Sequence, residues 1–106
     1  MYNGSDIVGR ISLELVPRTP EELRSNLELV KEKIKGVDLI NIPDLLRLET
    51  RSWQGAAIAQ DYYPAVMPHI RAIDVNLAEP LAMRPELRQS GITEVLVIEG
   101  DPPQDM

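Results

Sequence analysis

Apolar and polar residues alternate in the segment 10–17, which reads RISLELVP. Ile11, Leu13 and Leu15 fall on one side of this alternation, and Glu14 falls on the other. Successive side chains of a β-strand point to opposite faces, so the pattern predicts a strand with an aliphatic face. Glu14 is then expected inside a strand, on the face opposite the aliphatic side chains.

A helix is predicted directly after this strand. Thr19 is a favourable cap, Pro20 fits the first helical position, and Glu22 lies three residues after the cap. The apolar residues that follow are spaced by four, three and four positions: Leu23, Leu27, Val30 and Ile34. This spacing gives one apolar stripe along a helix. Gly36 is expected to end the helix.

The remainder of the chain repeats the alternation of strands and helices. In chain order, the expected elements are a strand at 37–43, a helix at about 49–60, a strand at 63–70, a helix at 76–90 and a strand at 93–98. Pro64 and Pro68 are expected at the ends of the third strand. Pro80 and Pro85 should make the third helix short, late-starting or kinked, because an interior proline costs about 3 kcal/mol.

This order predicts an α/β fold with parallel strands, because each strand is followed by a connection long enough to cross over the sheet. The apolar run VLVI in the last strand is typical of a strand covered on both faces. Two architectures fit, an open doubly wound sheet and a (β/α)₈ barrel. A barrel needs about 200 residues or more, so 106 residues with four strands would form half of one.

Composition excludes several classes of function. The net charge of −6, without a basic cluster, argues against nucleic acid or an anionic membrane as the partner. The chain has no cysteine, which excludes disulfides and thiol chemistry. No apolar run approaches the ~20 residues of a membrane span, and the first residues do not resemble a signal peptide. We therefore expect a cytoplasmic protein, and with a single histidine we expect no metal site.

Candidate chemistry gathers where the predicted strands end, which is where parallel α/β folds place their sites. Glu14 would face the lumen of a barrel, where desolvation favours a protonated carboxyl group and general-acid chemistry; otherwise it faces water at a strand edge. His69 either contacts a ligand or forms an ordinary hydrogen bond at a strand end. Gly100 lets backbone approach a ligand beside Asp101, although Gly-Asp-Pro-Pro also suits a plain turn.

Three stretches resemble the amino-terminal half of the methylenetetrahydrofolate reductase family, whose members are flavin enzymes built as (β/α)₈ barrels. They read SLELVPRTPEELRSNL, PAVMPHIRAID and GITEVLVIEGDPP, and they are similar to the family's first, third and fourth strands with the adjoining segments. The resemblance runs from about Ile11 to Pro103. It implies that residues 1–106 form a single partial barrel domain, the first half of a TIM barrel and a fragment of a longer chain.

The resemblance also implies an activity and a set of roles. The activity is the FAD-dependent reduction of 5,10-methylenetetrahydrofolate to 5-methyltetrahydrofolate, with NAD(P)H as the electron source and a folate as the substrate. Glu14 matches the family's general acid, and Asp101 matches an aspartate near the folate and the flavin. His69 matches a flavin contact, and Gly100 belongs to the same cofactor-binding loop.

Two departures from the family pattern keep a second interpretation open. Pro43 stands where the family's second strand ends in a hydroxyl-bearing residue, and Glu99 precedes Gly100 where arginine or threonine is usual. An added negative charge beside a bound dinucleotide is unfavourable. The alternative is a non-catalytic folate-binding or methyl-transfer partner of the same fold that lacks flavin. In either case, the exposed edges of a half barrel predict a homo-oligomer or contact with the rest of the barrel.

Overall fold

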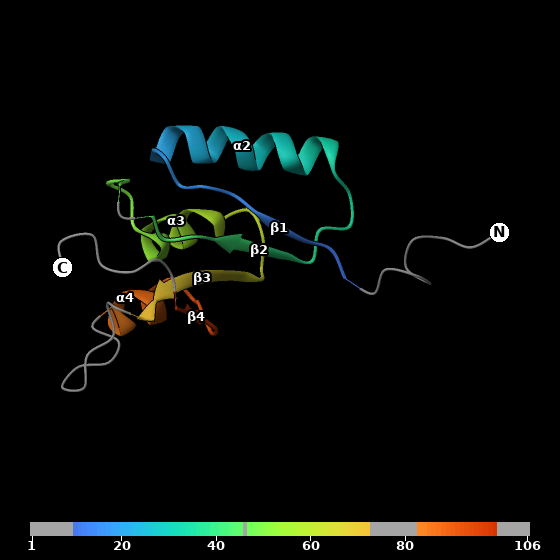
Figure 1. The fold of residues 1–106 in the computed structure, drawn as a ribbon. Helices are drawn as coiled ribbons and strands as arrows, with labels where there is room; N and C mark the ends of the chain where they lie inside the picture. The colour runs from blue at the N-terminus through green and yellow to red at the C-terminus, as the bar shows by residue number, and fades with distance from the viewer. Residues whose placement is uncertain (1–9, 46, 73–82, 100–106) are drawn as a thin grey trace.

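The computed structural model describes residues 10–45, 47–72 and 83–99, in which strands and helices alternate (Figure 1). The elements are β1 (Ser12–Glu14), α2 (Pro20–Lys33), β2 (Leu39–Ile42), α3 (Ser52–Ala59), β3 (Val66–Arg71), α4 (Arg84–Gln89) and β4 (Leu96–Ile98). Each expected strand and helix is present, and the six whose predicted ranges are fully described are shorter than predicted. None of these helices is long and apolar enough to cross a membrane.

The four strands form one parallel sheet in the order β1-β2-β3-β4. Glu14 of β1 pairs with Asn41 of β2, and Ile70 of β3 pairs with Val97 of β4. Each new strand is therefore added on the same side of the one before it. Since crossovers between parallel strands are almost always right-handed, this order carries every connecting helix to the same face of the sheet. The predicted α/β class and parallel strands are confirmed.

Helix α2 begins as the sequence predicts. The Thr19 hydroxyl oxygen accepts a hydrogen bond from the Glu22 backbone N–H at 3.1 Å, and Pro20 occupies the first turn. The helix ends at Lys33, before the predicted end, because Ile34 already has extended dihedral angles. Gly36 instead adopts a positive φ of 77° in the connection to β2, a conformation that side chains other than glycine's disfavour.

The core lies between the sheet and the helices. On the sheet side, Ile40, Ile42 and Ile70 are fully buried, and they pack with buried side chains from α2, α3 and α4 in one cluster. Helix α3 approaches the sheet closely because it is rich in small residues. A Cβ atom added at Gly55 would lie 2.8 Å from the Pro17 Cβ atom, closer than carbon atoms pack.

Prolines shape β3 and α4 in different ways. Pro68 lies inside β3, fully buried and paired with Ile42, so its expected place at the end of the strand was wrong. It is tolerated because β2 ends at this level and β4 begins to pair only at the next residue, His69, so few sheet hydrogen bonds are lost. Helix α4 begins at Arg84 with Pro85 in its first turn, as a late start requires; the predicted positions 76–82 lie outside the described residues.

Strand β4 is more exposed than its apolar sequence predicted. Leu96 is 42% exposed and Val97 is 50% exposed. The expectation of cover on both faces was wrong because β4 is the last strand of the sheet. Within the described residues, no helix packs against β4 as extensively as α3 packs against β2 and β3.

Candidate functional site

A row of polar side chains crosses the face of the sheet that the helices leave open. In β2, Ile40 and Ile42 turn toward the helices, so the alternation of the strand turns Asn41 to the open face. The Asn41 side-chain amide donates a hydrogen bond to the Ser12 hydroxyl on β1. On its other side, the Asn41 Oδ1 atom lies 3.1 Å from His69 Nε2 on β3. The row therefore links three neighbouring strands through Asn41.

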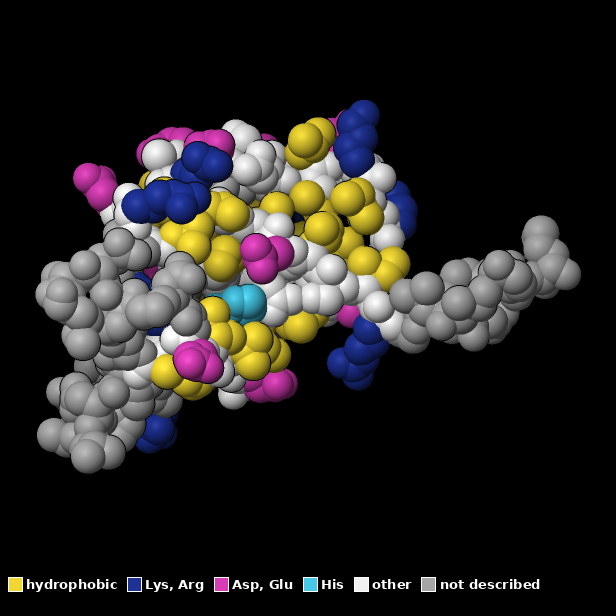
Figure 2. Space-filling view, viewed as in Figure 1, with side chains coloured by type: hydrophobic (Ala, Val, Ile, Leu, Met, Phe, Trp, Pro, Cys, Tyr) yellow, Lys and Arg dark blue, Asp and Glu magenta, His cyan; other side chains and the backbone are white. Residues whose placement is uncertain are grey.

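His69 is held through both its ring and its backbone. Because the Asn41 Oδ1 atom is a carbonyl oxygen and can only accept, the His69 Nε2 atom carries a proton and donates it. The backbone carbonyl of His69 accepts a hydrogen bond of 2.6 Å from the Ser52 hydroxyl, at the start of α3. Figure 2 shows this face, with the histidine side chain in cyan at the surface among yellow apolar side chains. The hydrogen bond considered for His69 is confirmed, whereas ligand contact stays a prediction.

Glu14 lies in the same row. It pairs in register with Asn41, so both side chains belong to the open face and to the carboxyl half of their strands. The Glu14 side chain is exposed. The desolvation expected for a carboxyl group in a barrel lumen is therefore not supplied by this chain alone, because the described residues cover only one face of the sheet.

A buried ion pair fixes the loop between β2 and α3. The Asp44 side chain is fully buried, and it accepts hydrogen bonds from Arg51 Nε at 3.0 Å and Arg51 Nη2 at 2.6 Å. It also accepts the Ser52 backbone N–H at 2.9 Å, which places a negative charge at the positive end of α3. The Arg51 guanidinium lies 4.5 Å from the centre of the Trp53 ring. Trp53 packs against the core.

Arg71 adds a positive charge to the same edge of the sheet. It is the last residue of β3, two positions after His69, and it is 6% exposed. By the alternation of the strand it shares the open face with His69. The carboxyl edge of the sheet thus combines a carboxylate, an amide, an imidazole and a guanidinium.

The other predicted site residues fall elsewhere. Gly100 and Asp101 lie outside the described residues, so their roles stay predictions. Glu99, directly before them, is exposed, and Pro43 is buried at the end of β2. Of the predicted catalytic and cofactor-binding residues, the structure brings Glu14 and His69 to either side of Asn41. Among the described residues, no group of three or more His, Cys, Asp or Glu side chains is placed to hold a metal ion.

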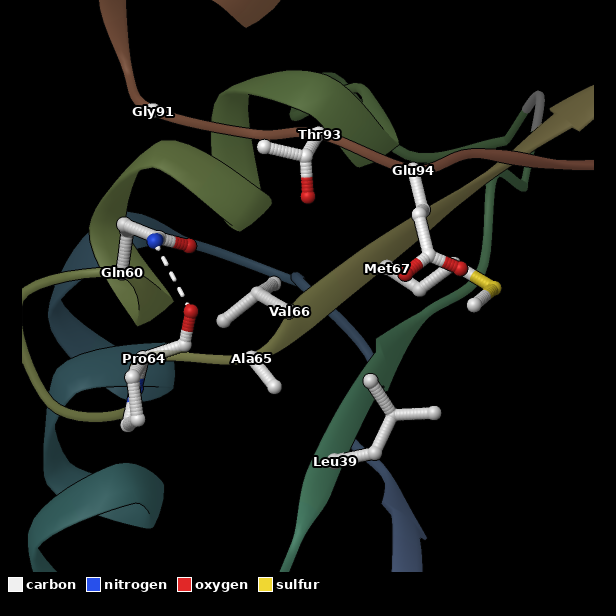
Figure 3. Close-up of a pocket in the computed structure, with 9 residues that line it drawn as sticks. All are labelled: Leu39, Gln60, Pro64, Ala65, Val66, Met67, Gly91, Thr93 and Glu94. Carbon is white, nitrogen blue, oxygen red and sulfur yellow. Dashed lines mark hydrogen bonds between the residues drawn. The ribbon is translucent and has the colours of Figure 1, made fainter.

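A small pocket lies at the opposite edge of the sheet, where the strands begin (Figure 3). It is lined by residues that include Leu39, Val66 and Glu94. Gln60 closes one side, and its Nε2 atom donates to the Pro64 carbonyl oxygen at 3.1 Å. The residues that line it include none of the predicted site residues, and parallel α/β folds place their sites at the other edge. We therefore assign the candidate site to the polar row.

Sequence reasoning gave Asn41 no role of its own, although a signal for it was present. The strand sequence LINI contains one polar residue between two buried isoleucines, and the alternation argument that singled out Glu14 applies equally to Asn41. The contact between Asp44 and Arg51 had no such signal. Their seven-residue separation crosses an irregular loop, whose path no periodicity describes.

Comparison with known proteins adds no family to these observations. A scan against protein-family models finds no match, and a search of the curated proteins finds none. The function of the polar row therefore has to be argued from the residues themselves and from the resemblance of the three sequence stretches.

Proposed function

We propose that the described sheet is the first half of a (β/α)₈ barrel. The strand order β1-β2-β3-β4 supports this, because a doubly wound sheet reverses its order at a switch point and this sheet does not within the described residues. Buried residues from all three helices join one cluster on one face of the sheet. The open face, which carries Glu14, Asn41 and His69, would then line the barrel interior.

On this basis we propose a flavin-dependent reductase of the methylenetetrahydrofolate reductase type, with a folate as substrate and NAD(P)H as electron source. The observation that carries the proposal is the polar row, in which Glu14 and His69 lie on the same face on either side of Asn41. The resemblance alone had assigned these two residues to the substrate and to the cofactor. Their convergence on one face is what a shared site requires.

The polar groups suit a flavin. The edge of a flavin ring carries both hydrogen-bond donors and acceptors, and the His69 imidazole and the Asn41 amide offer both kinds of group side by side. Arg71 places a buried guanidinium at the same edge. When bound, FAD would supply hydride transfer, and Gly100 would let the backbone approach it.

The chain's own residues would orient the ligands and move one proton. His69, held by Asn41 and Ser52, would present its Nδ1 atom to the cofactor as a fixed acceptor. Glu14 would give its carboxyl proton to the folate nitrogen that is released when the five-membered ring opens. Asp101, which resembles the family's aspartate near the folate and the flavin, would act beside Glu14.

A second function is favoured by two described residues. Pro43 is buried at the end of β2, where the family has a hydroxyl-bearing residue, and a proline offers neither a side-chain nor a backbone donor. Glu99 adds a negative charge near the loop that would approach the cofactor. These features suit a folate-binding or methyl-transfer partner that does not use flavin.

Titration of the purified chain with FAD, followed by quenching of flavin fluorescence, separates the two functions. The reductase proposal expects saturable binding that His69→Ala weakens by about tenfold, the value of one hydrogen bond. Gln60→Ala, in the pocket at the opposite edge, is the matched control and should leave binding unchanged.

Glu14→Gln should leave FAD binding unchanged. In a preparation that reduces the folate, it should lower the rate by about 10²–10⁴, the contribution of a general acid. Absence of FAD binding together with saturable folate binding would contradict the reductase proposal and favour the flavin-free folate-binding partner. Unchanged turnover in Glu14→Gln would remove the acid role.

A further inference from the structure

We infer that two copies of this chain close into one eight-stranded parallel barrel, in which β4 of each copy lies beside β1 of the other. The inference goes beyond the proposed function and rests only on its barrel architecture, because it is drawn from the two edges of the sheet rather than from the polar row.

The two edge strands expose apolar side chains on the sides where no described strand pairs with them. The sheet order places β1 at one edge and β4 at the other. Ile11, just before β1, is 39% exposed, and Leu96 and Val97 in β4 are 42% and 50% exposed. Exposed apolar edge strands are sites where another strand can pair. Both edges therefore offer backbone hydrogen-bonding groups together with apolar side chains.

The charges at these edges are opposite in sign. Arg10 precedes β1 and Arg18 follows it, and both are exposed. Glu94 precedes β4 and Glu99 follows it, and both are also exposed. When β1 of one copy runs parallel to β4 of another in the register that sets Arg10 opposite Glu94, Leu13 lies opposite Val97, three positions farther along both strands. The apolar residues therefore meet directly after this charged contact.

The same charges disfavour the other ways of joining two copies. A twofold axis between two β4 strands would make them antiparallel and set Glu94 against Glu99 of the partner copy. The equivalent contact between two β1 strands would set Arg10 against Arg18. Like charges placed directly opposite destabilise strand pairs, so β1 pairs best with β4.

Closure follows from the strand count and from the position of the helices. A contact between unlike surfaces forms a ring only when the rotation closes, and four strands are half of the eight in a (β/α)₈ barrel. The buried residues of the helices join one cluster on one face of the sheet, which becomes the outside of the barrel. The open faces of the two copies then cover each other, and the exposed Glu14 side chain gains the enclosed surroundings that one copy cannot supply.

The test is sedimentation equilibrium of the purified chain and its charge-reversal variants at low ionic strength. The wild-type chain should form a dimer and no larger species. Arg10→Glu and Glu94→Arg should each weaken the dimer by about tenfold, since each sets like charges together at both contacts. An equimolar mixture of the two variants should recover wild-type affinity, because every contact in the mixed dimer again joins opposite charges.

Two further variants serve as controls. Val97→Lys should abolish the dimer, whereas Leu29→Lys, at an equally exposed apolar position on α2, should leave it intact. Circular dichroism of each variant confirms that the fold is kept. A wild-type chain that stays monomeric would overturn the inference and assign the two edges to further strands of a longer chain. A dimer that is insensitive to Arg10→Glu, or growth into open polymers, would overturn it as well.

Discussion

The two faces of this sheet differ in what holds their side chains. On the covered face, Ile40, Ile42 and Ile70 are fully buried against the helices. On the open face, the neighbouring positions Asn41 and His69 are only partly buried and are joined by a hydrogen bond. Adjacent residues of one strand thus serve different purposes. The covered face stabilises the chain, and the open face is free to carry chemistry because little stability depends on it.

The largest expected effect is on the covered face. Ile42→Ala should lower the free energy of unfolding by about 3 kcal/mol, because it removes buried methyl groups and leaves a cavity between β2 and α3. Urea denaturation at fixed protein concentration measures the change. The matched control is Asn41→Ala, one residue away on the open face, which should cost about 1 kcal/mol, the value of its hydrogen bonds. Equal losses at the two positions would contradict the division between the faces.

A comparable loss is expected in the loop that follows β2. Asp44→Ala should destabilise the chain by roughly 3 kcal/mol, since it leaves the Arg51 guanidinium without its carboxylate and the start of α3 without its acceptor. Arg51→Ala should cost no less, because it leaves the fully buried Asp44 carboxylate without its guanidinium partner.

Salt provides a separate check on the Asp44 prediction. The Asp44 side chain is fully buried, so the loss should persist at high ionic strength, where exposed ion pairs are screened. If Asp44→Ala and the wild-type chain unfold at the same urea concentration in high salt, the stabilising role assigned to this ion pair is wrong.

The smallest effect is expected at Glu14. Glu14→Gln should change the free energy of unfolding by less than about 0.5 kcal/mol, because the side chain is exposed. A measured loss as large as that of Asn41→Ala would show that Glu14 supports the fold, and it would remove the reason for reserving it for chemistry.

Sequence patterns predicted those elements whose signals are local. Helix α2 has its cap, its first-turn proline and its apolar stripe within a single segment, and its start at Pro20 was predicted correctly. The face of β1 on which Glu14 lies followed from the alternation of apolar and polar residues in this strand. The exposure of β4 could not be predicted, because VLVI reads as a buried strand wherever neighbours exist to cover it. Burial depends on neighbours and not on the strand's own residues.

The candidate site shows the same limit. Glu14 and His69 were singled out one at a time, from their places in separate strands. Their position on either side of Asn41 depends on the register between β1, β2 and β3, which is a property of the assembled sheet. Asp44 was given no role from the sequence, and its burial depends on how the loop to α3 folds back.

By itself, the order of residues determined the alternation of strands and helices, the parallel direction of the strands and the side of each strand on which a residue lies. These follow from periodicity and connection length, which act over a few residues at a time. Tertiary structure alone decided the strand order, the buried contact of Asp44 with Arg51, the link from Ser12 through Asn41 to His69, and the exposure of the two sheet edges. Each of these joins segments far apart along the chain, so each depends on packing and register that only the folded sheet establishes.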